Sequence, residues 1–244
     1  MNTKLKKKEE SRSFKLIITC EHASNKLPVE AKKLHIPQAV LESHRGYDIG
    51  ALSVYKKIVK RLRPDFHCAA KYSRLFIDLN RSITNKNSFN EFWDAATSKG
   101  DVPKSLKDVA IDYHKKYREP IETFVTECLK NKTPIIHLAI HSFTPILNGE
   151  KRNTDVGILY DPSNPVERKL ADTIINDIKK YAAQLRIRKN YPYQGKTDGL
   201  CTTLRKNSTM AHSKEFYLYA GFEIEFNQNL FGKPQFIDYI NRMT

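Results

Sequence analysis

Short apolar runs alternate with amphipathic segments along this chain, and the alternation limits the folds open to it. Runs rich in apolar and β-branched residues predict strands at 16–20, 67–70, 75–78, 135–141, 156–160 and 222–226. Apolar residues at three- and four-residue spacing predict helices at 51–62, 106–129 and 166–181, with a last helix from Pro234. Strands alternating with helices indicate a mostly parallel sheet covered on both faces.

The length of the chain suits one large domain. With 244 residues, 40% of them hydrophobic, it can bury a substantial core. We therefore expect a basic N-terminal tail at 1–14 and a single domain at 15–244. The polar segment 85–101 predicts a loop or lid. The four scattered cysteines form no CxxC pair and are expected to be reduced thiols. Because no apolar run approaches the ~20 residues of a membrane span, we expect a cytoplasmic protein with no membrane partner.

The formal net charge of +15 raises the alternative of a nucleic-acid-binding protein. The basic residues are spread along the predicted helices, where solvated faces explain them, and no RNA- or DNA-binding signature accompanies them. Nucleic acid is therefore an unfavoured partner. The rival reading that stays open is a basic nucleic-acid-binding protein on a degenerate hydrolase fold.

Chemically versatile residues follow several predicted strands. Glu21 and His22 come directly after the first strand, residues 78–81 end another, and His141 ends a third. Ligands of open α/β sheets bind outside the carboxyl ends of the strands, so these groups are expected to face one crevice. Alternation along the strand at 222–226 places Glu223 and Glu225 on the same side of the sheet.

His22 and His141 are the natural pair of nitrogen ligands for a metal ion. A catalytic zinc site commonly adds one carboxylate, for which Glu21, Asp48 and Asp78 are candidates, and leaves the fourth position for water. The alternative is that both histidines are hydrogen-bonded structural residues. The sequence has no HExxH, GxSxG or phosphate-binding glycine loop, which disfavours the common zinc protease, serine hydrolase and nucleotide-binding classes.

The segment 72–81, YSRLFIDLNR, carries two arginines suited to bind a carboxylate. A guanidinium matches a planar carboxylate with two parallel hydrogen bonds, and it stays charged at any physiological pH. The plain alternative is that Asp78 pairs with an arginine as a structural salt bridge.

Six motifs occur in order: CEHASNKLP, HRGYDIGA, YSRLFIDLNR, IHSFTP, NYPYQGKTDG and FEIEFNQNL. Together they resemble the N-formylglutamate amidohydrolase family, which is itself similar in fold to the zinc carboxypeptidases. The resemblance covers residues 16–230. It implies a three-layer α/β/α sandwich of the phosphorylase/hydrolase-like kind, with a mixed, mostly parallel sheet and one catalytic zinc ion. The implied activity is hydrolysis of the amide of an N-acyl amino acid, with N-formyl-L-glutamate giving formate and glutamate.

The resemblance also implies roles for individual residues. His22, Asp48 and His141 match the metal ligands, with Glu21 as the reserve carboxylate, because the HxxE motif of carboxypeptidases would need a glutamate where Asn25 stands. For the rest of the site, the resemblance implies Glu223 as the general base. It implies that Asn80 and Arg81, assisted by Arg74, bind the carboxylate of the substrate.

One departure bears on the substrate. Glu225 replaces an arginine expected from the resemblance. A deacylase or carboxypeptidase-like enzyme acting on another small carboxylate-bearing substrate therefore remains the alternative.

Overall fold

A six-stranded mixed sheet forms the centre of the protein in the computed structural model, which describes residues 12–211, 218–233, 236 and 240. The strand order is β2-β1-β3-β8-β6-β7. Their bounds are β1 Lys15–Cys20, β2 Phe66–Ala69, β3 Ile135–Phe143, β6 Val156–Leu159, β7 Ile187–Lys189 and β8 Tyr219–Asn227. β2, β1, β3 and β8 run parallel, whereas β6 lies antiparallel to β8 and parallel to β7. The predicted mixed, mostly parallel sheet is confirmed.

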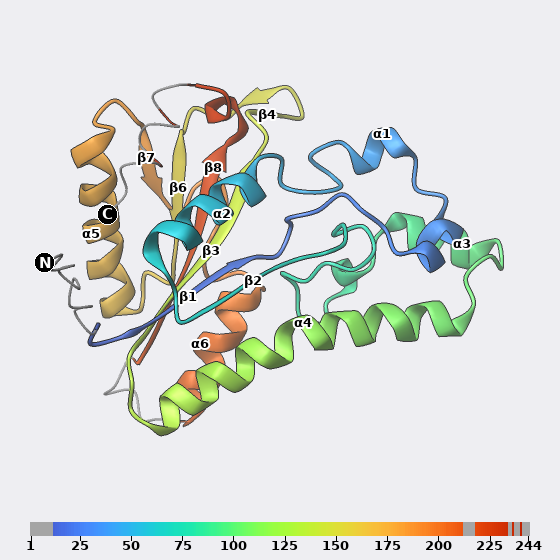
Figure 1. Ribbon diagram of the computed structural model, residues 1–244. Helices are drawn as coiled ribbons and strands as arrows, with labels where there is room; N and C mark the ends of the chain where they lie inside the picture. Colours follow the sequence, from blue (N-terminus) through green and yellow to red (C-terminus); the bar gives the residue numbers. More distant parts are fainter. Residues whose placement is uncertain (1–11, 212–217, 234–235, 237–239, 241–244) are drawn as a thin grey trace, which may run out of the picture.

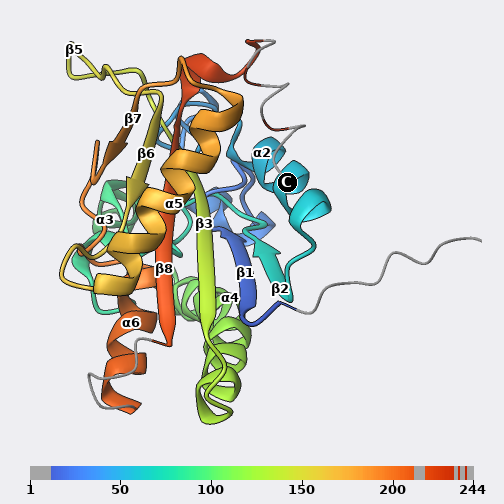
Figure 2. The same cartoon turned by 90° about the vertical axis from the view of Figure 1, so that its left-hand side faces the viewer.

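Helices cover both faces of this sheet, which completes the predicted three-layer α/β/α sandwich (Figures 1 and 2). α2 (Ala51–Leu62) packs on β1 and β3, and α5 (Pro165–Tyr181) packs on β8. On the other face, α6 (Leu200–Ala211) packs on β8 and against α4 (Lys104–Lys130), which continues through Pro120. None of the described helices combines the length and apolar character needed to cross a bilayer.

Shorter elements complete the described chain. They are η1 (Val29–Leu34), α1 (Gln38–Leu41), η2 (Lys86–Ser88), α3 (Glu91–Ser98), β4 (Ile146–Leu147), β5 (Glu150–Lys151) and η3 (Gln228–Leu230). β4 and β5 pair as a separate two-stranded hairpin. Residues 1–11 of the predicted basic tail and most of the predicted helix from Pro234 lie outside the described residues.

The core lies on both sides of the central strands. Ile17 and Ile18 are neighbours on β1, so their side chains point to opposite faces, and neither is exposed to solvent. A strand buried on both faces reads as a continuous apolar run, which is why the strands were visible in the sequence. Truncating either isoleucine to alanine is expected to cost about 2–5 kcal/mol of folding free energy.

The prediction of a strand at 75–78 is wrong. Residues 72–81 form a succession of turns, although Phe76 and Ile77 are fully buried. The backbone of this segment is satisfied by neighbouring residues instead of a strand: Trp93 Nε1 donates to Phe76 O at 2.9 Å, and Asn90 Nδ2 donates to Leu75 O at 2.7 Å. A short apolar run has the same composition in a buried loop and in a strand, so its hydrogen-bond partners decide the outcome.

The prediction of a loop at 85–101 is also wrong in part, because η2 and α3 lie within it. Asn85 and Asn90 cap these elements by accepting hydrogen bonds from Asn87 N and Phe92 N. Trp93 is buried against Phe76, with ring centroids 6.1 Å apart. This segment therefore packs behind the turns of residues 72–81 and supports them.

Candidate metal and substrate site

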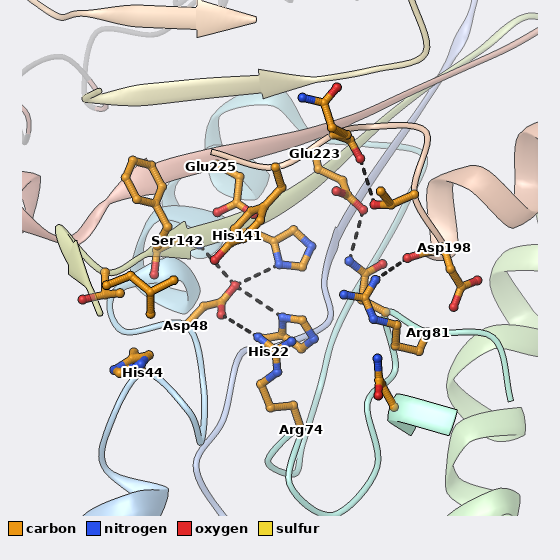
Figure 3. Close-up of a pocket in the computed structure, with 18 of the residues that line it drawn as sticks. His22, His44, Asp48, Arg74, Arg81, His141, Ser142, Asp198, Glu223 and Glu225 are labelled. Carbon is orange, nitrogen blue, oxygen red and sulfur yellow. Dashed lines mark hydrogen bonds and ion pairs between the residues drawn. The ribbon is translucent and has the colours of Figure 1, made fainter. Parts of the chain in front are cut away.

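A polar cavity of about 540 Å³ opens at the carboxyl ends of β1, β3 and β8, where the sequence predicted a crevice (Figure 3). Of the residues that the sequence nominated, two candidate carboxylate ligands, Glu21 and Asp78, lie outside the lining of this cavity, and the other seven line it. These are His22, Asp48, Arg74, Asn80, Arg81, His141 and Glu223. His22 lies two residues after the last residue of β1, and His141 lies on β3.

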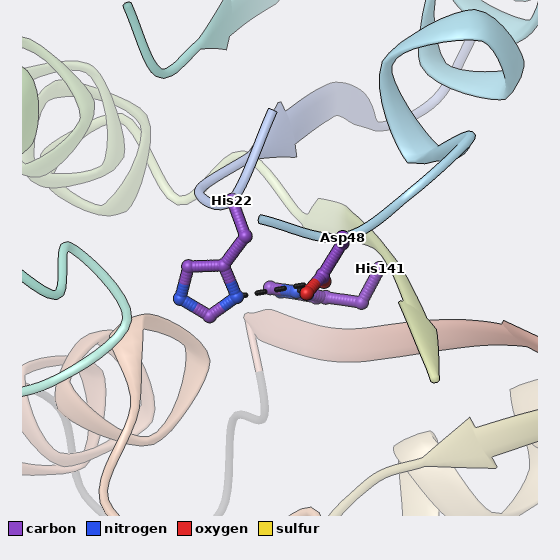
Figure 4. A group of neighbouring side chains, drawn as sticks. All are labelled: His22, Asp48 and His141. Atoms are coloured by element: carbon purple, nitrogen blue, oxygen red, sulfur yellow. Dashed lines mark hydrogen bonds and ion pairs between the residues drawn. The ribbon is translucent and has the colours of Figure 1, made fainter. Parts of the chain in front are cut away.

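His22, Asp48 and His141 form a buried group that could hold a metal ion, with one ligand atom from each lying within 4.8 Å of the others (Figure 4). Asp48 Oδ2 lies 2.9 Å from His141 Nδ1 and 3.5 Å from His22 Nδ1. Asp48 comes from the loop before α2, and its backbone N–H donates to His22 O at 2.9 Å. Chain folding alone therefore brings the Asp48 carboxylate over the end of β1.

The far nitrogen of each histidine faces a second carboxylate. His22 Nε2 is 2.7 Å from Asp78 Oδ1, and His141 Nε2 is 3.0 Å from Glu21 Oε2, the latter without hydrogen-bond geometry. Outer carboxylates of this kind fix ring orientation and leave the other nitrogen for the metal. Because Glu21 lies beyond His141 and is fully buried, the geometry selects Asp48 over Glu21 as the candidate carboxylate ligand.

The electrostatics of this group suit a cation. Burial opposes ionisation of Glu21, but the close approach and positive charge of His141 outweigh it and lower the Glu21 pKa to about 2. Burial likewise opposes charging of His141, yet Asp48 and Glu21 raise its pKa well above the usual value. The pKa of Asp48 is lowered despite burial, through His22 and His141. Buried carboxylates thus hold protons on the imidazoles, and a bound metal ion would displace those protons.

Arg74 is engaged by carboxylates of the site. Its NH2 lies 2.9 Å from Asp78 Oδ2 and its NH1 lies 3.5 Å from Asp48 Oδ1. The predicted structural pairing of Asp78 with an arginine is therefore present. Arg74 lines the cavity, but its contacts mainly stabilise the acids behind the two histidines.

Among the described residues, the Arg81 guanidinium makes one hydrogen bond, which leaves its other donors available to a ligand. Its NH1 donates to Asp198 O, while its own backbone O accepts from Arg118 NH1 at 2.9 Å. The Asp198 carboxylate accepts from Ser82 N at 3.0 Å and Asn85 Nδ2 at 2.6 Å. The turn that carries Arg81 is thus fixed, with its guanidinium on the cavity wall.

Sequence reasoning gave no role to Asp198, although it lies in the motif NYPYQGKTDG. The next residue, Gly199, lies directly before α6. It could have drawn attention to this segment, because a glycine allows other side chains to approach the backbone closely. A Cβ at Gly199 would lie 3.0 Å from Glu223 Oε1 and 3.1 Å from Asn80 Oδ1.

Glu223 and Glu225 both line the cavity, as strand alternation predicted, but their surroundings differ. Glu223 is half-buried and accepts a hydrogen bond from Asn80 Nδ2 at 3.1 Å. Glu225 pairs in register with His141 and is buried, and its Oε2 has no hydrogen-bond partner in the part of the chain that the structure describes. Burial raises the Glu225 pKa to about 8, and the nearby Asp48 adds to this effect.

The fold and the site together define the class: an α/β protein with a buried His-Asp-His group that could hold a metal ion, in a polar cavity at the strand ends. The family model of N-formylglutamate amidohydrolase matches residues 14–231. The chain therefore belongs to the N-formylglutamate amidohydrolase family, and its class of chemistry is hydrolysis of an amide bond.

Solved structures support the same fold. The crystal structure of gene product Atu2144 from Agrobacterium tumefaciens aligns with a TM-score of 0.68 at 22% sequence identity. The alignment covers 93% of this chain and 86% of that one. A search of curated proteins finds no match.

Proposed function

We propose that this protein is a zinc-dependent amidohydrolase that cleaves N-formyl-L-glutamate to formate and glutamate. The observation that carries the proposal is the family match over residues 14–231. The cavity adds chemical support, since it combines a candidate metal group with an arginine for a carboxylate. The substrate is a small molecule, which agrees with a cavity in the size range of ligand sites.

His22, Asp48 and His141 would hold the zinc ion, and their donor set of two imidazoles and one carboxylate is common among catalytic zinc sites. When bound, zinc polarises the amide carbonyl and makes water nucleophilic near neutral pH. Asp78 and Glu21 orient the two imidazoles from behind. Arg81 binds the substrate carboxylate and so positions the amide for attack.

The proton of the attacking water passes to a strand carboxylate and then to the leaving nitrogen, which departs as an amine while the C–N bond breaks. The sequence nominated Glu223 for this task, and that assignment stays a prediction. Glu225 is the stronger candidate on three observations: its register with His141, its burial and its unpaired oxygen. A cation at the site would lower the raised pKa of Glu225 and leave it ionised to accept the proton.

Formate release tests both assignments. Zinc-loaded protein is expected to release formate from N-formyl-L-glutamate, and Glu225→Gln to reduce kcat at least ~100-fold with the metal retained. Glu223→Gln is the matched variant, two residues along the same strand. A loss of kcat confined to Glu223→Gln would return the base to Glu223. If metal-loaded protein releases no formate but hydrolyses another N-acyl amino acid, the substrate assignment is wrong and the deacylase alternative holds.

A further inference from the structure

Glu223 is a carboxylate that the proton-transfer scheme above leaves without a task. It lines the cavity, and within the described part of the chain its side chain has one hydrogen-bond partner, Asn80, and no cation. A half-buried carboxylate on a cavity wall keeps acceptor capacity that the donor of a bound ligand can use.

The orientation of Asn80 is fixed by the backbone. Asn80 Oδ1 accepts from Leu200 N at 2.9 Å, at the first residue of α6, and a backbone N–H can only donate. Asn80 Nδ2 must therefore be the atom that faces Glu223 Oε1, at 3.1 Å. The backbone N–H of Asn80 donates in turn to Asp78 Oδ1 at 2.9 Å. Asn80, which binds Glu223, is thus itself fixed by hydrogen bonds at its side-chain oxygen and at its backbone N–H.

Glu223 and Arg81 line the same cavity, and Asn80, the residue next to Arg81, binds Glu223 directly. Both face the cavity beside the metal group (Figure 3). An N-acylated α-amino acid carries a carboxylate and an amide N–H on the same carbon atom. The Arg81 guanidinium suits the carboxylate, and the Glu223 carboxylate suits the N–H.

We propose that Glu223 accepts a hydrogen bond from the scissile amide N–H and thereby restricts the substrates to secondary amides of α-amino acids. The inference rests on the proposed function and names the class of substrate within it. Amides whose nitrogen carries an alkyl group, including those of imino acids, are disfavoured because they leave the Glu223 oxygen without a donor. Rejection of a ligand that lacks a required N–H is characteristic of sites that contain a polar group to bind it.

Binding of a matched pair of ligands tests the inference without turnover. The ligands are N-formyl-L-glutamate and its N-methyl analogue, titrated by calorimetry into metal-loaded Glu225→Gln protein, with formate measured in parallel. We expect the N–H ligand to bind at least ~10-fold more tightly, as a hydrogen bond to a charged group predicts. Adding Glu223→Gln should abolish this preference, because the Gln oxygen must accept from Asn80 Nδ2 and its NH2 group then faces the substrate N–H.

Glu30→Gln, which removes one exposed carboxylate away from the cavity, is the control and should keep the preference. Equal binding of both ligands, or an equal weakening of both by Glu223→Gln, overturns the inference. Formate release by unmutated protein separates this result from failure of the proposed function. If the protein releases formate but shows no N–H preference, the inference alone fails; if it shows the preference but releases no formate, the proposed function alone fails.

Discussion

Asp78 Oδ1 lies 2.7 Å from His22 Nε2, and the same carboxylate binds Arg74 through its other oxygen at 2.9 Å. Burial opposes the charge of Asp78, but Arg74 and His22 outweigh it and lower the Asp78 pKa well below its usual range. Asp78 therefore stays ionised and holds the proton of His22 on Nε2, leaving Nδ1 to face Asp48.

Asp78→Asn is predicted to weaken zinc binding about 10–100-fold, because a neutral amide makes a poorer partner for His22 and reduces its basicity as a ligand. Competition with a chromophoric chelator measures the zinc Kd. Asp198→Asn is the control, since Asp198 also lines the cavity but binds Ser82 and Asn85. Equal zinc affinity in Asp78→Asn and the unmutated protein would show that Asp78 does not orient the ligand.

His22→Ala and His141→Ala are each predicted to lose stoichiometric zinc, because either change removes one of the three proposed protein ligands. Elemental analysis of the purified protein after dialysis provides the measurement. His44→Ala is the matched control: His44 lines the same cavity but is not part of the buried group. Zinc retained in both His22→Ala and His141→Ala would move the metal site elsewhere.

The strands and long helices were predictable because burial on both faces leaves an unbroken apolar signal. β1, β3 and β8 are such strands, and α2 and α5 show the expected three- and four-residue spacing. The turns at 72–81 were mistaken for a strand because side chains of Asn90 and Trp93 bind their backbone, and such partners are invisible in local sequence.

The site was predictable where residues follow strands, as His22 does, because topology brings strand ends together. What could not be predicted was how the acids divide their tasks. Glu21, Asp48 and Asp78 were equivalent candidates from the residues alone. Only their positions around the two histidines separate the candidate ligand Asp48, which lies between the rings, from the two outer partners. The difference in hydrogen bonding between Glu223 and Glu225 likewise depends on Asn80, which binds Glu223 and lies 143 positions from it in the sequence.

Arg81→Lys is predicted to lower kcat/KM for N-formyl-L-glutamate about 10–100-fold while the zinc content stays unchanged. Lysine keeps the charge but cannot make two parallel hydrogen bonds to a carboxylate, and charge-assisted hydrogen bonds are worth about 1.5–3 kcal/mol. Steady-state formate release measures the effect. Arg45→Lys, at an exposed arginine outside the cavity, is the control. An unchanged kcat/KM in Arg81→Lys would remove Arg81 from the substrate site.

His137 is predicted to make stability depend on pH below about 6.5. It is fully buried on β3, with Nε2 2.8 Å from Thr19 Oγ1 and Nδ1 2.7 Å from Tyr219 OH. Burial lowers its pKa from 6.5 to about 4, with Arg205 and His141 adding to the effect against Glu21. Between these values the unfolded chain binds a proton that the folded protein excludes, so the contribution is complete above pH 6.5 and lost as pH falls towards 4.

Denaturant unfolding at pH 6.5 and pH 4.5 measures this dependence. Relative to His137→Gln, which does not titrate, the unmutated protein should lose about 2 kcal/mol of unfolding free energy between the two pH values. Comparing the change across pH cancels the constant cost of altering a buried hydrogen-bonded side chain. If both proteins lose the same unfolding free energy between the two pH values, His137 is not the group that excludes the proton. The pH dependence of stability then comes from other buried groups such as His114, whose pKa is also lowered by burial.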